Sequence, residues 1–281
     1  MATRNYAVLG SPIVHSKSPL IHKTAYGVLG LDWDYQKVEV RKGGLRTFID
    51  DSGADFSGLS VTMPLKEEAC RFASNLDETA QLTGAVNTLV KTETGWNGFN
   101  TDVFGIVQSV RSAGLPPLER VLIIGSGATA TSAVVAVSEL APKAEVLIFA
   151  RNQQTRAQLV ELAKFVGMNA RGAKRLKSAA QQADLTIATL PGGALDSVAD
   201  KLKGWFGFSP RGALLDVVYS PWPSKFASLW QNASKPAISG LEMLMWQAIA
   251  QLRIFTLGSS NEELHNEVAV VSAIQHALQN S

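Results

Sequence analysis

The stretch from Arg120 to Ala130 reads RVLIIGSGATA, an apolar run that leads directly into a glycine-rich turn. The run predicts a buried strand, and the turn that follows it opens a predicted helix, as the dinucleotide-binding fingerprint GxGxxA requires. In that fingerprint the first glycine permits a tight turn, the second lets the backbone approach a pyrophosphate, and a small third residue allows close helix packing. Free N–H groups at the helix N-terminus favour the phosphates. The stretch predicts a dinucleotide site, and a tight turn that merely needs glycine is the alternative.

The next predicted strand ends in LIFARNQQTR, and no acidic residue stands between Val146 and Gln158. NAD enzymes generally place an acid there for the ribose hydroxyls. Arg151 and Arg156 instead bracket Asn152, and a guanidinium suits the 2′-phosphate of NADP. The pattern favours NADP, with solvated arginines at a helix start as the alternative. The predicted cofactor site comprises Gly125, Ser126, Gly127, Ala128, Thr129, Ala130, Arg151, Asn152, Arg156, Thr189 and Gly240.

Strands alternate with helices on both sides of this turn. The alternation downstream predicts a doubly wound domain over residues 116–240, and a similar one upstream predicts parallel βαβ units over residues 1–115. Residues 241–281 have helical apolar spacing without a strand, so we expect two terminal helices that pack back on the first domain. The predicted fold class is therefore α/β, with an N-terminal substrate domain and a C-terminal Rossmann-type domain.

Composition limits the classes of partner. The chain has 281 residues, of which 46% are hydrophobic and 18% charged, with a net charge of +2 and no run of basic residues. These values are typical of a globular protein and exclude an electrostatic nucleic-acid surface. We therefore expect a small-molecule substrate, no nucleic-acid partner and no membrane partner.

Several other features have simple interpretations. No apolar stretch is long enough for a membrane helix, and the first ten residues lack the pattern of a secretory leader, so we expect a cytoplasmic protein. The lone Cys70 excludes an intramolecular disulfide and a thiolate zinc cluster. Because His15 and His22 lack metal-ligand spacing, no metal is expected.

Polar residues cluster at loop ends in the first half of the chain. Ser16 and Ser18 precede a helix that Pro19 would begin well, so their hydroxyls could grip a carboxylate, although an N-cap explains such a serine equally well. Thr62 ends a predicted strand, and Lys66 stands near a helix start, where the helix dipole disfavours positive charge.

Two further loop ends carry Asn87 and the Asn100, Thr101, Asp102 trio. Helix capping alone could explain Asp102. It does not explain why Lys66, Asn87 and Asp102 all stand at strand and helix junctions, where they could share one crevice at the carboxyl ends of the strands.

Five ordered segments carry a resemblance to a known family: GSPIVHSKSP (10–19), SVTMPLK (60–66), GAVNTL (84–89), GFNTDVFG (98–105) and SGLEMLMWQA (239–248). In order and spacing they resemble the motifs of shikimate dehydrogenases, in particular actinobacterial members, over nearly the whole chain. The chain departs from the family pattern at Ser60, where the family usually has Asn. This departure removes no catalytic position.

The resemblance implies reversible reduction of 3-dehydroshikimate to shikimate by NADPH, in the route to chorismate and the aromatic amino acids. It implies that Lys66 and Asp102 form the catalytic pair, with Lys66 moving the hydroxyl proton. It further implies that Ser16, Ser18 and Tyr219 bind the carboxylate of shikimate. Thr62, Asn87 and Gln247 would surround the ring hydroxyls together with Lys66 and Asp102.

Two alternatives remain. An NAD-dependent quinate/shikimate dehydrogenase would keep Lys66 and Asp102 but should have an acid where Arg151 stands. A noncatalytic ligand sensor belongs to a different class, and the intact pair and the lack of an appended helix-turn-helix weigh against it. The chain could act as a monomer or as a homodimer.

Overall fold

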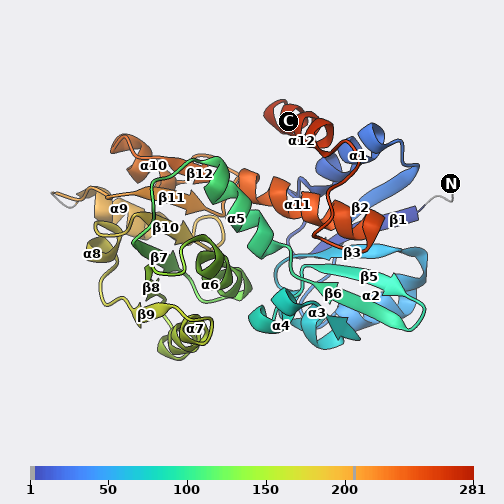
Figure 1. The fold of residues 1–281 in the computed structure, drawn as a ribbon, viewed down its shortest axis with the longest axis horizontal. Coiled ribbons are helices and arrows are strands. Elements are labelled where there is room, and N and C mark those ends of the chain that lie inside the picture. The colour runs from blue at the N-terminus through green and yellow to red at the C-terminus, as the bar shows by residue number, and fades with distance from the viewer. Residues whose placement is uncertain (1–3, 205–206) are drawn as a thin grey trace. The chain divides into compact units, whose positions relative to one another are not determined.

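The structure is a computed structural model that describes residues 4–204 and 207–281. The chain divides into two compact units, which are residues 1–105 with 244–281 (unit 1) and residues 106–243 (unit 2). The divisions fall inside α5 (Asp102–Ser112) and α11 (Gly240–Leu257) (Figure 1). The boundaries predicted from the sequence are residues 115 and 240, which lie past the end of α5 and at the first residue of α11. The structure places each division within the helix itself.

Unit 1 is built on a six-stranded sheet with the strand order β2-β1-β3-β5-β6-β4. Its elements, besides parts of α5 and α11, are β1 (Arg4–Gly10), α1 (Ser18–Leu29), β2 (Trp33–Glu39), α2 (Leu45–Ser52), a 3₁₀ turn (Gly53–Asp55), β3 (Gly58–Val61), α3 (Lys66–Phe72), β4 (Asn75–Leu76), α4 (Glu78–Thr83), β5 (Thr88–Thr92), β6 (Gly95–Phe99) and α12 (Glu267–Gln279).

The sheet of unit 1 is mixed, so the prediction of parallel βαβ units throughout this domain is wrong. Strand β1 pairs in parallel with β2 and β3, whereas β5 is antiparallel to both β3 and β6. Only Glu93 and Thr94 join β5 to β6, which is enough for a hairpin but too short for a crossover helix. As a result, the start of β5 and the end of β6 lie at the same edge of the sheet as the end of β3.

Helices cover both faces of this sheet. Leu9, Leu59 and Val61 pack in a buried cluster with residues of α2 and α3. On the opposite face, the Tyr6 ring lies 4.5 Å from the ring of Phe255 in α11. Helix α12 packs against α1, so the C-terminal helix belongs to unit 1 (Figure 1).

Unit 2 has a six-stranded sheet in the order β12-β11-β10-β7-β8-β9, and all its strand pairs are parallel. Its elements, besides parts of α5 and α11, are β7 (Arg120–Ile124), α6 (Ala128–Leu140), β8 (Glu145–Phe149), α7 (Gln153–Phe165), β9 (Asn169–Gly172), α8 (Leu176–Ala180), β10 (Leu185–Ala188), α9 (Asp196–Gly204), β11 (Ala213–Asp216), α10 (Lys225–Asn232) and β12 (Ala237–Ser239). The order reverses between β7 and β10, which is the doubly wound arrangement with its switch point there.

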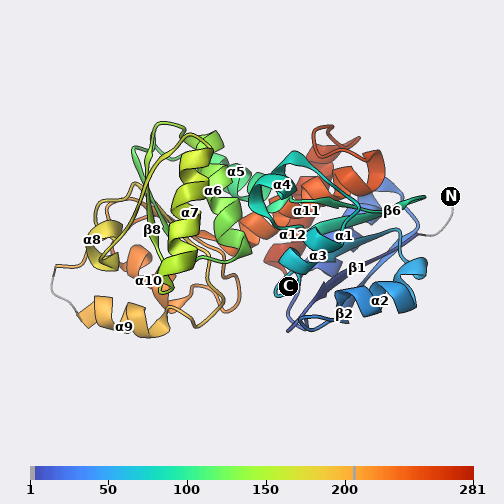
Figure 2. The same ribbon diagram turned by 90° about the horizontal axis from the view of Figure 1, so that it is seen from below.

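The sheet of unit 2 lies between two layers of helices. Figures 1 and 2 show α6 and α7 on one side and α9 and α10 on the other. Leu122, Leu147 and Leu214 of the sheet pack with α8, α9 and α10 in one buried cluster. The predicted fold class, two α/β domains of which one is doubly wound, is confirmed.

Side chains fix the starts of two helices. Helix α7 begins at Gln153, because the Asn152 side chain caps it by accepting from the N–H groups of Gln154 and Thr155. Helix α12 begins at Glu267, whose carboxylate accepts a hydrogen bond from the Leu264 N–H. In the described ranges, no helix has the length and apolar content that crossing a membrane requires.

Candidate active site

Lys66 and Asp102 form an ion pair in unit 1. Each is the first residue of a helix, Lys66 of α3 and Asp102 of α5, and Lys66 Nζ lies 2.5 Å from Asp102 Oδ2. Positive charge at a helix N-terminus is unfavourable, and the Asp102 carboxylate compensates for it. The pair therefore places an ammonium group, a possible proton donor or acceptor, at a fixed position.

Asn87 donates a hydrogen bond to the second carboxylate oxygen of Asp102. Its Nδ2 donates to Asp102 Oδ1 at 2.8 Å and to Thr101 Oγ1 at 2.9 Å. Its Oδ1 accepts from the Thr101 N–H at 2.9 Å. These bonds fix which end of the Asn87 amide faces Asp102, and both carboxylate oxygens thus have a donor.

Gln247 of α11 completes this cluster. Its Oε1 lies 3.4 Å from Asn87 Nδ2, and its Nε2 donates to the Leu244 carbonyl at 2.8 Å. The predicted residues Lys66, Asn87, Asp102 and Gln247 are therefore brought together in unit 1.

The sheet explains how distant loops meet in this cluster. Lys66 follows β3, Asn87 precedes β5, and Asp102 follows β6. Because β5 runs antiparallel to its neighbours, all three loops emerge at one edge. The backbone N–H of Asp102 donates to the side chain of Asn100 at 2.9 Å. The Asp102 carboxylate binds Lys66 and Asn87, which are contacts that a role in helix capping alone does not require.

The other predicted residues of unit 1 lie between a strand end and the following helix start at this edge. Thr62 directly follows β3 and is half-buried. Ser16 and Ser18 follow β1, the parallel neighbour of β3. The N-cap residue of α1 is Lys17, which makes no side-chain cap bond. Ser16 Oγ accepts from the N–H of Ser18, the first residue of α1, at 3.3 Å, so Ser16 satisfies one N–H group at this helix start although it is not the N-cap residue.

Tyr219 lies in unit 2, shortly after β11. The side chain is half-buried, and burial raises the pKa of its hydroxyl. The hydroxyl is therefore a neutral donor at physiological pH.

The glycine turn of unit 2 lies at the switch point of the sheet. Gly125 has φ +125°, and a Cβ there would stand 2.3 Å from Thr189 Oγ1, the hydroxyl that donates to the Ile124 carbonyl. A Cβ on Gly240 would stand 2.0 Å from the Val217 carbonyl oxygen. Only glycine fits either position.

The start of α6 leaves room for an anion. Gly127 is the N-cap and makes no side-chain cap bond, and the helix begins at Ala128. Nothing lies within 4 Å of the place where a Gly127 Cβ would be, and Ala130 is fully buried. The turn thus fits a pyrophosphate group, which would meet uncapped N–H groups.

The first turn of α7 lies beside this glycine turn. Thr155 Oγ1 donates to Ser126 Oγ at 2.9 Å. Within residues 4–204 and 207–281, no carboxylate forms an ion pair with Arg151 or Arg156. Both guanidinium groups are therefore available to a phosphate.

The sequence reasoning missed two polar contacts of these sites. Thr155, which binds Ser126, gives no signal beyond a threonine near a helix start. Gln251 donates to the Asn87 carbonyl at 3.1 Å, and its position one helical turn after Gln247 could have indicated that it shares the face of that residue.

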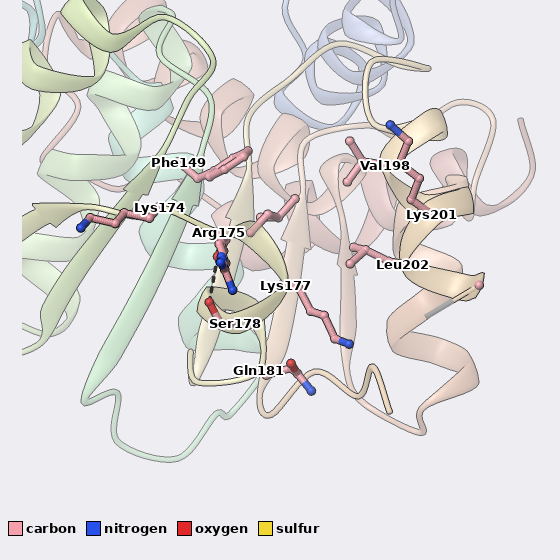
Figure 3. A pocket seen from close by; sticks show the side chains of 11 residues that line it. Phe149, Lys174, Arg175, Lys177, Ser178, Gln181, Val198, Lys201 and Leu202 are labelled. Atoms are coloured by element: carbon pink, nitrogen blue, oxygen red, sulfur yellow. Dashed lines mark hydrogen bonds between the residues drawn. The ribbon is translucent and has the colours of Figure 1, made fainter. Parts of the chain in front are cut away.

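A pocket of about 740 Å³ lies on the α8 and α9 side of unit 2 (Figure 3). Phe149 and Val198 line one end and Lys177 and Gln181 the other, as Figure 3 shows. None of the predicted site residues is among the described residues that line it. The pocket is thus separate from the glycine turn and from the Lys66 cluster.

Comparison with known proteins gives the family. Residues 8–89 match the family described as "Shikimate dehydrogenase substrate binding domain". The chain is 31% identical over 255 residues to the shikimate dehydrogenase (NADP(+)) of Ignicoccus hospitalis, covering 91% of this chain and 94% of that protein. It is also 31% identical to the pentafunctional AROM polypeptide of Candida tropicalis, but it spans only 17% of that protein's length.

Solved structures agree over the same extent. The crystal structure of Mycobacterium tuberculosis shikimate dehydrogenase is 35% identical, with a TM-score of 0.84 over 99% of this chain and 100% of that chain. The shikimate 5-dehydrogenase of Thermus thermophilus, in complex with NADP(H) and shikimate, is 28% identical, with a TM-score of 0.81 over 98% and 99% of the two chains. Because the match at 31% identity extends over 94% of the Ignicoccus protein, the chain belongs to the shikimate dehydrogenase family.

Proposed function

We propose that the protein is an NADP-dependent shikimate dehydrogenase that reduces 3-dehydroshikimate to shikimate and catalyses the reverse oxidation. The observation that carries the proposal is the Lys66–Asp102 pair at the edge of the unit 1 sheet, in which Asp102 accepts from Asn87 and Asn87 in turn bonds to Gln247. Support comes from the Thermus relative, whose structure contains NADP(H) and shikimate.

Lys66 carries the proton. When the ring carbonyl is reduced, the Lys66 ammonium donates a proton to the oxygen, and when the alcohol is oxidised, the neutral amine accepts it. Asp102 orients Nζ through their 2.5 Å contact. Asn87 holds Asp102 in turn, so the ammonium has a fixed direction before the substrate arrives.

The remaining polar residues recognise the substrate. Ser16 and Ser18 donate to its carboxylate, with Tyr219 as a third hydroxyl donor. Thr62, Asn87 and Gln247 surround the ring hydroxyls together with the catalytic pair. Hydroxyl and amide groups suit this task because each can donate to one oxygen and accept from another.

The glycine turn holds NADPH, which supplies the hydride. The N–H groups at the start of α6 bind its pyrophosphate, and Arg151 and Arg156 bind its 2′-phosphate with the help of Asn152. The lack of a carboxylate partner for either arginine within the described residues supports this role. Gly240 and Thr189 contribute backbone or hydroxyl contacts at the switch point.

The test is an initial-rate assay at the absorbance band of the reduced nicotinamide. Shikimate or quinate is paired in turn with NADP or NAD. Turnover that is fastest with shikimate and NADP supports the proposal, whereas a preference for NAD or quinate selects a quinate/shikimate dehydrogenase. Binding of shikimate without turnover in any pairing would make the protein a sensor of this ligand.

We further propose that the enzyme works in the cytoplasm as a monomer or homodimer, on a small molecule alone. Light scattering of the purified protein at several concentrations distinguishes the two assembly states.

A further inference from the structure

A chain of buried side chains continues from the Lys66 cluster into the interior of unit 1. It contains Tyr35 of β2, Ser60 of β3, Gln251 of α11 and Thr88 of β5, which are 0%, 4%, 1% and 0% exposed. Nothing in the proposed chemistry uses these residues. Burying so many polar groups is costly unless each is hydrogen-bonded, and each one is.

The bonds run from β2 to α11. The Tyr35 hydroxyl donates to Ser60 Oγ at 2.6 Å, and Ser60 Oγ donates to Gln251 Oε1 at 2.9 Å. Gln251 determines which group donates in each of these hydrogen bonds, because its Nε2 donates to the Asn87 backbone carbonyl, which can only accept. Oε1 must therefore face Ser60, which makes Ser60 the donor and leaves it to accept from Tyr35.

The chain then reaches Asp102. Gln251 Nε2 also donates to Thr88 Oγ1 at 2.9 Å, and Thr88 Oγ1 donates to Asn87 Oδ1 at 2.9 Å. Together with the bond from the Thr101 N–H, this bond keeps Oδ1 away from Asp102, so Asn87 presents its Nδ2 to the carboxylate at 2.8 Å. Rotation of the Asn87 amide would put an oxygen against the carboxylate and break the bond to Thr88.

The other end of the chain is Tyr35. Burial raises the pKa of its hydroxyl, so the hydroxyl keeps its proton at physiological pH and donates it to Ser60.

We infer that Tyr35, Ser60, Thr88 and Gln251 are positioning residues that hold Asn87, and through it Asp102 and Lys66, in the orientation needed for proton transfer. The inference rests on the proposed function. Gln251 is the central member, because its side chain contacts Ser60, Thr88 and the Asn87 backbone carbonyl.

The test compares three single variants, and the double variant of Tyr35→Phe with Gln251→Met, for oxidation of shikimate by NADP. Gln251→Met keeps the length of the side chain and removes its hydrogen bonds, and Tyr35→Phe removes one hydroxyl and keeps the ring. Thr256→Val is the matched control, because Thr256 lies on the same helix and donates only to backbone carbonyls of that helix. Circular dichroism establishes that each variant is folded at the assay temperature.

We expect Gln251→Met to lower kcat about tenfold, the effect of about 1.4 kcal/mol on the barrier. Its KM for NADP should stay that of the wild type, because the proposed cofactor residues lie in unit 2. Tyr35→Phe should lower kcat less, and the double variant should be no slower than Gln251→Met alone, because residues that act as a unit are not additive. Thr256→Val should keep the wild-type kcat.

A wild-type kcat in folded Gln251→Met would overturn the inference, and so would independent, multiplying effects in the double variant. If Gln251→Met does not fold, Tyr35→Phe decides: a lowered kcat supports the inference and a wild-type kcat overturns it. The wild-type protein is assayed first, so its inactivity toward shikimate identifies a failure of the proposed function, which overturns both.

Discussion

Lys66 and Asp102 are the first residues of two different helices, and their side chains are 12% and 4% exposed where they form their ion pair. The two residues have opposite effects on the helices that they begin. Asp102 is favourable at the start of α5, whereas Lys66 is unfavourable at the start of α3 and is stabilised by Asp102. A buried charge pair of this kind is expensive to break, because the remaining partner stays buried without compensation.

Lys66→Ala should lower turnover of shikimate by roughly 10² to 10⁴, the range that one acid–base group supplies. Binding of NADP should not change, because the proposed cofactor site lies in unit 2. Initial rates and fluorescence titration with NADPH measure the two quantities. Lys91→Ala is the control, since Lys91 is an exposed lysine that donates to the Ala54 carbonyl. Near wild-type turnover in Lys66→Ala would remove Lys66 from the mechanism.

Arg151→Ala should raise the KM for NADP about tenfold or more and leave the KM for NAD unchanged, because a charged hydrogen bond to the 2′-phosphate is worth about 1.5–3 kcal/mol. The matched control is Arg171→Ala, which removes an exposed arginine of unit 2 that is paired with Glu145. An equal effect of Arg151→Ala on both dinucleotides would show that Arg151 does not read the 2′-phosphate.

Gly125→Ala should destabilise the glycine turn, because the new Cβ would stand 2.3 Å from Thr189 Oγ1 at a φ of +125°. We expect a loss of about 2 kcal/mol in the free energy of unfolding, together with weaker NADP binding. Urea unfolding measures the first effect. Gly27→Ala on α1 is the control, since nothing lies within 4 Å of its Cβ position. A stability equal to the wild type in Gly125→Ala would contradict the close contact.

His22 should make the stability of unit 1 depend on pH. Burial lowers its pKa from 6.5 to about 4, partly offset by its hydrogen bond to the Ser18 carbonyl. Since the unfolded chain binds a proton that the folded one resists, stability is full above about pH 6.5 and falls as the pH drops toward about 4, by on the order of 3 kcal/mol.

Urea unfolding at about pH 7.5 and about pH 5 measures this dependence. His22→Phe keeps an aromatic ring against Tyr35, whose ring lies 4.0 Å away, and should reduce the difference between the two conditions. The exposed His276 provides the comparison, and His276→Gln should leave the difference as it is. An unchanged difference in His22→Phe would assign the pH dependence to other groups.

The ion pair between Arg253 and Glu267 should be essential for docking α12. Their side chains are 8% and 12% exposed, and both Nε and Nη2 of Arg253 donate to the carboxylate. Glu267→Ala leaves the buried guanidinium unpaired and should cost about 3–5 kcal/mol of unfolding free energy. Glu263→Ala, at an exposed position nearby, should cost almost nothing. Comparable stability of the two variants would show that the pair is not needed.

The strands of unit 2 could be predicted where they are buried on both faces. RVLII (120–124) and EVLIF (145–149) are nearly continuous apolar runs, as parallel strands between two helix layers require. Strand β9, with the sequence NARG (169–172), could not be found in this way, because it lies at the sheet edge and has few apolar residues. In unit 1, the short connection at Glu93 and Thr94 was the available signal for the hairpin that the prediction missed.

The site could be predicted where a residue type contradicts its local position, as Lys66 does at a helix start. Tyr35, Ser60 and Gln251 satisfy their local positions, two in strands and one in a helix. Their hydrogen bonds join residues far apart in the chain, and these contacts depend on strand register and helix rotation, which local patterns do not reveal.

The discontinuity of unit 1 also determines when the cluster can form during protein synthesis. Residues 106–243 are contiguous, so unit 2 can fold as soon as they leave the ribosome. Lys66, Asn87 and Asp102 have been made by then, but Gln247, Gln251 and the Arg253–Glu267 pair come later in the chain. Until those residues are made, the face of the N-terminal sheet that α11 covers stays exposed. A chain that ended at residue 243 would contain the whole of unit 2 and only part of unit 1.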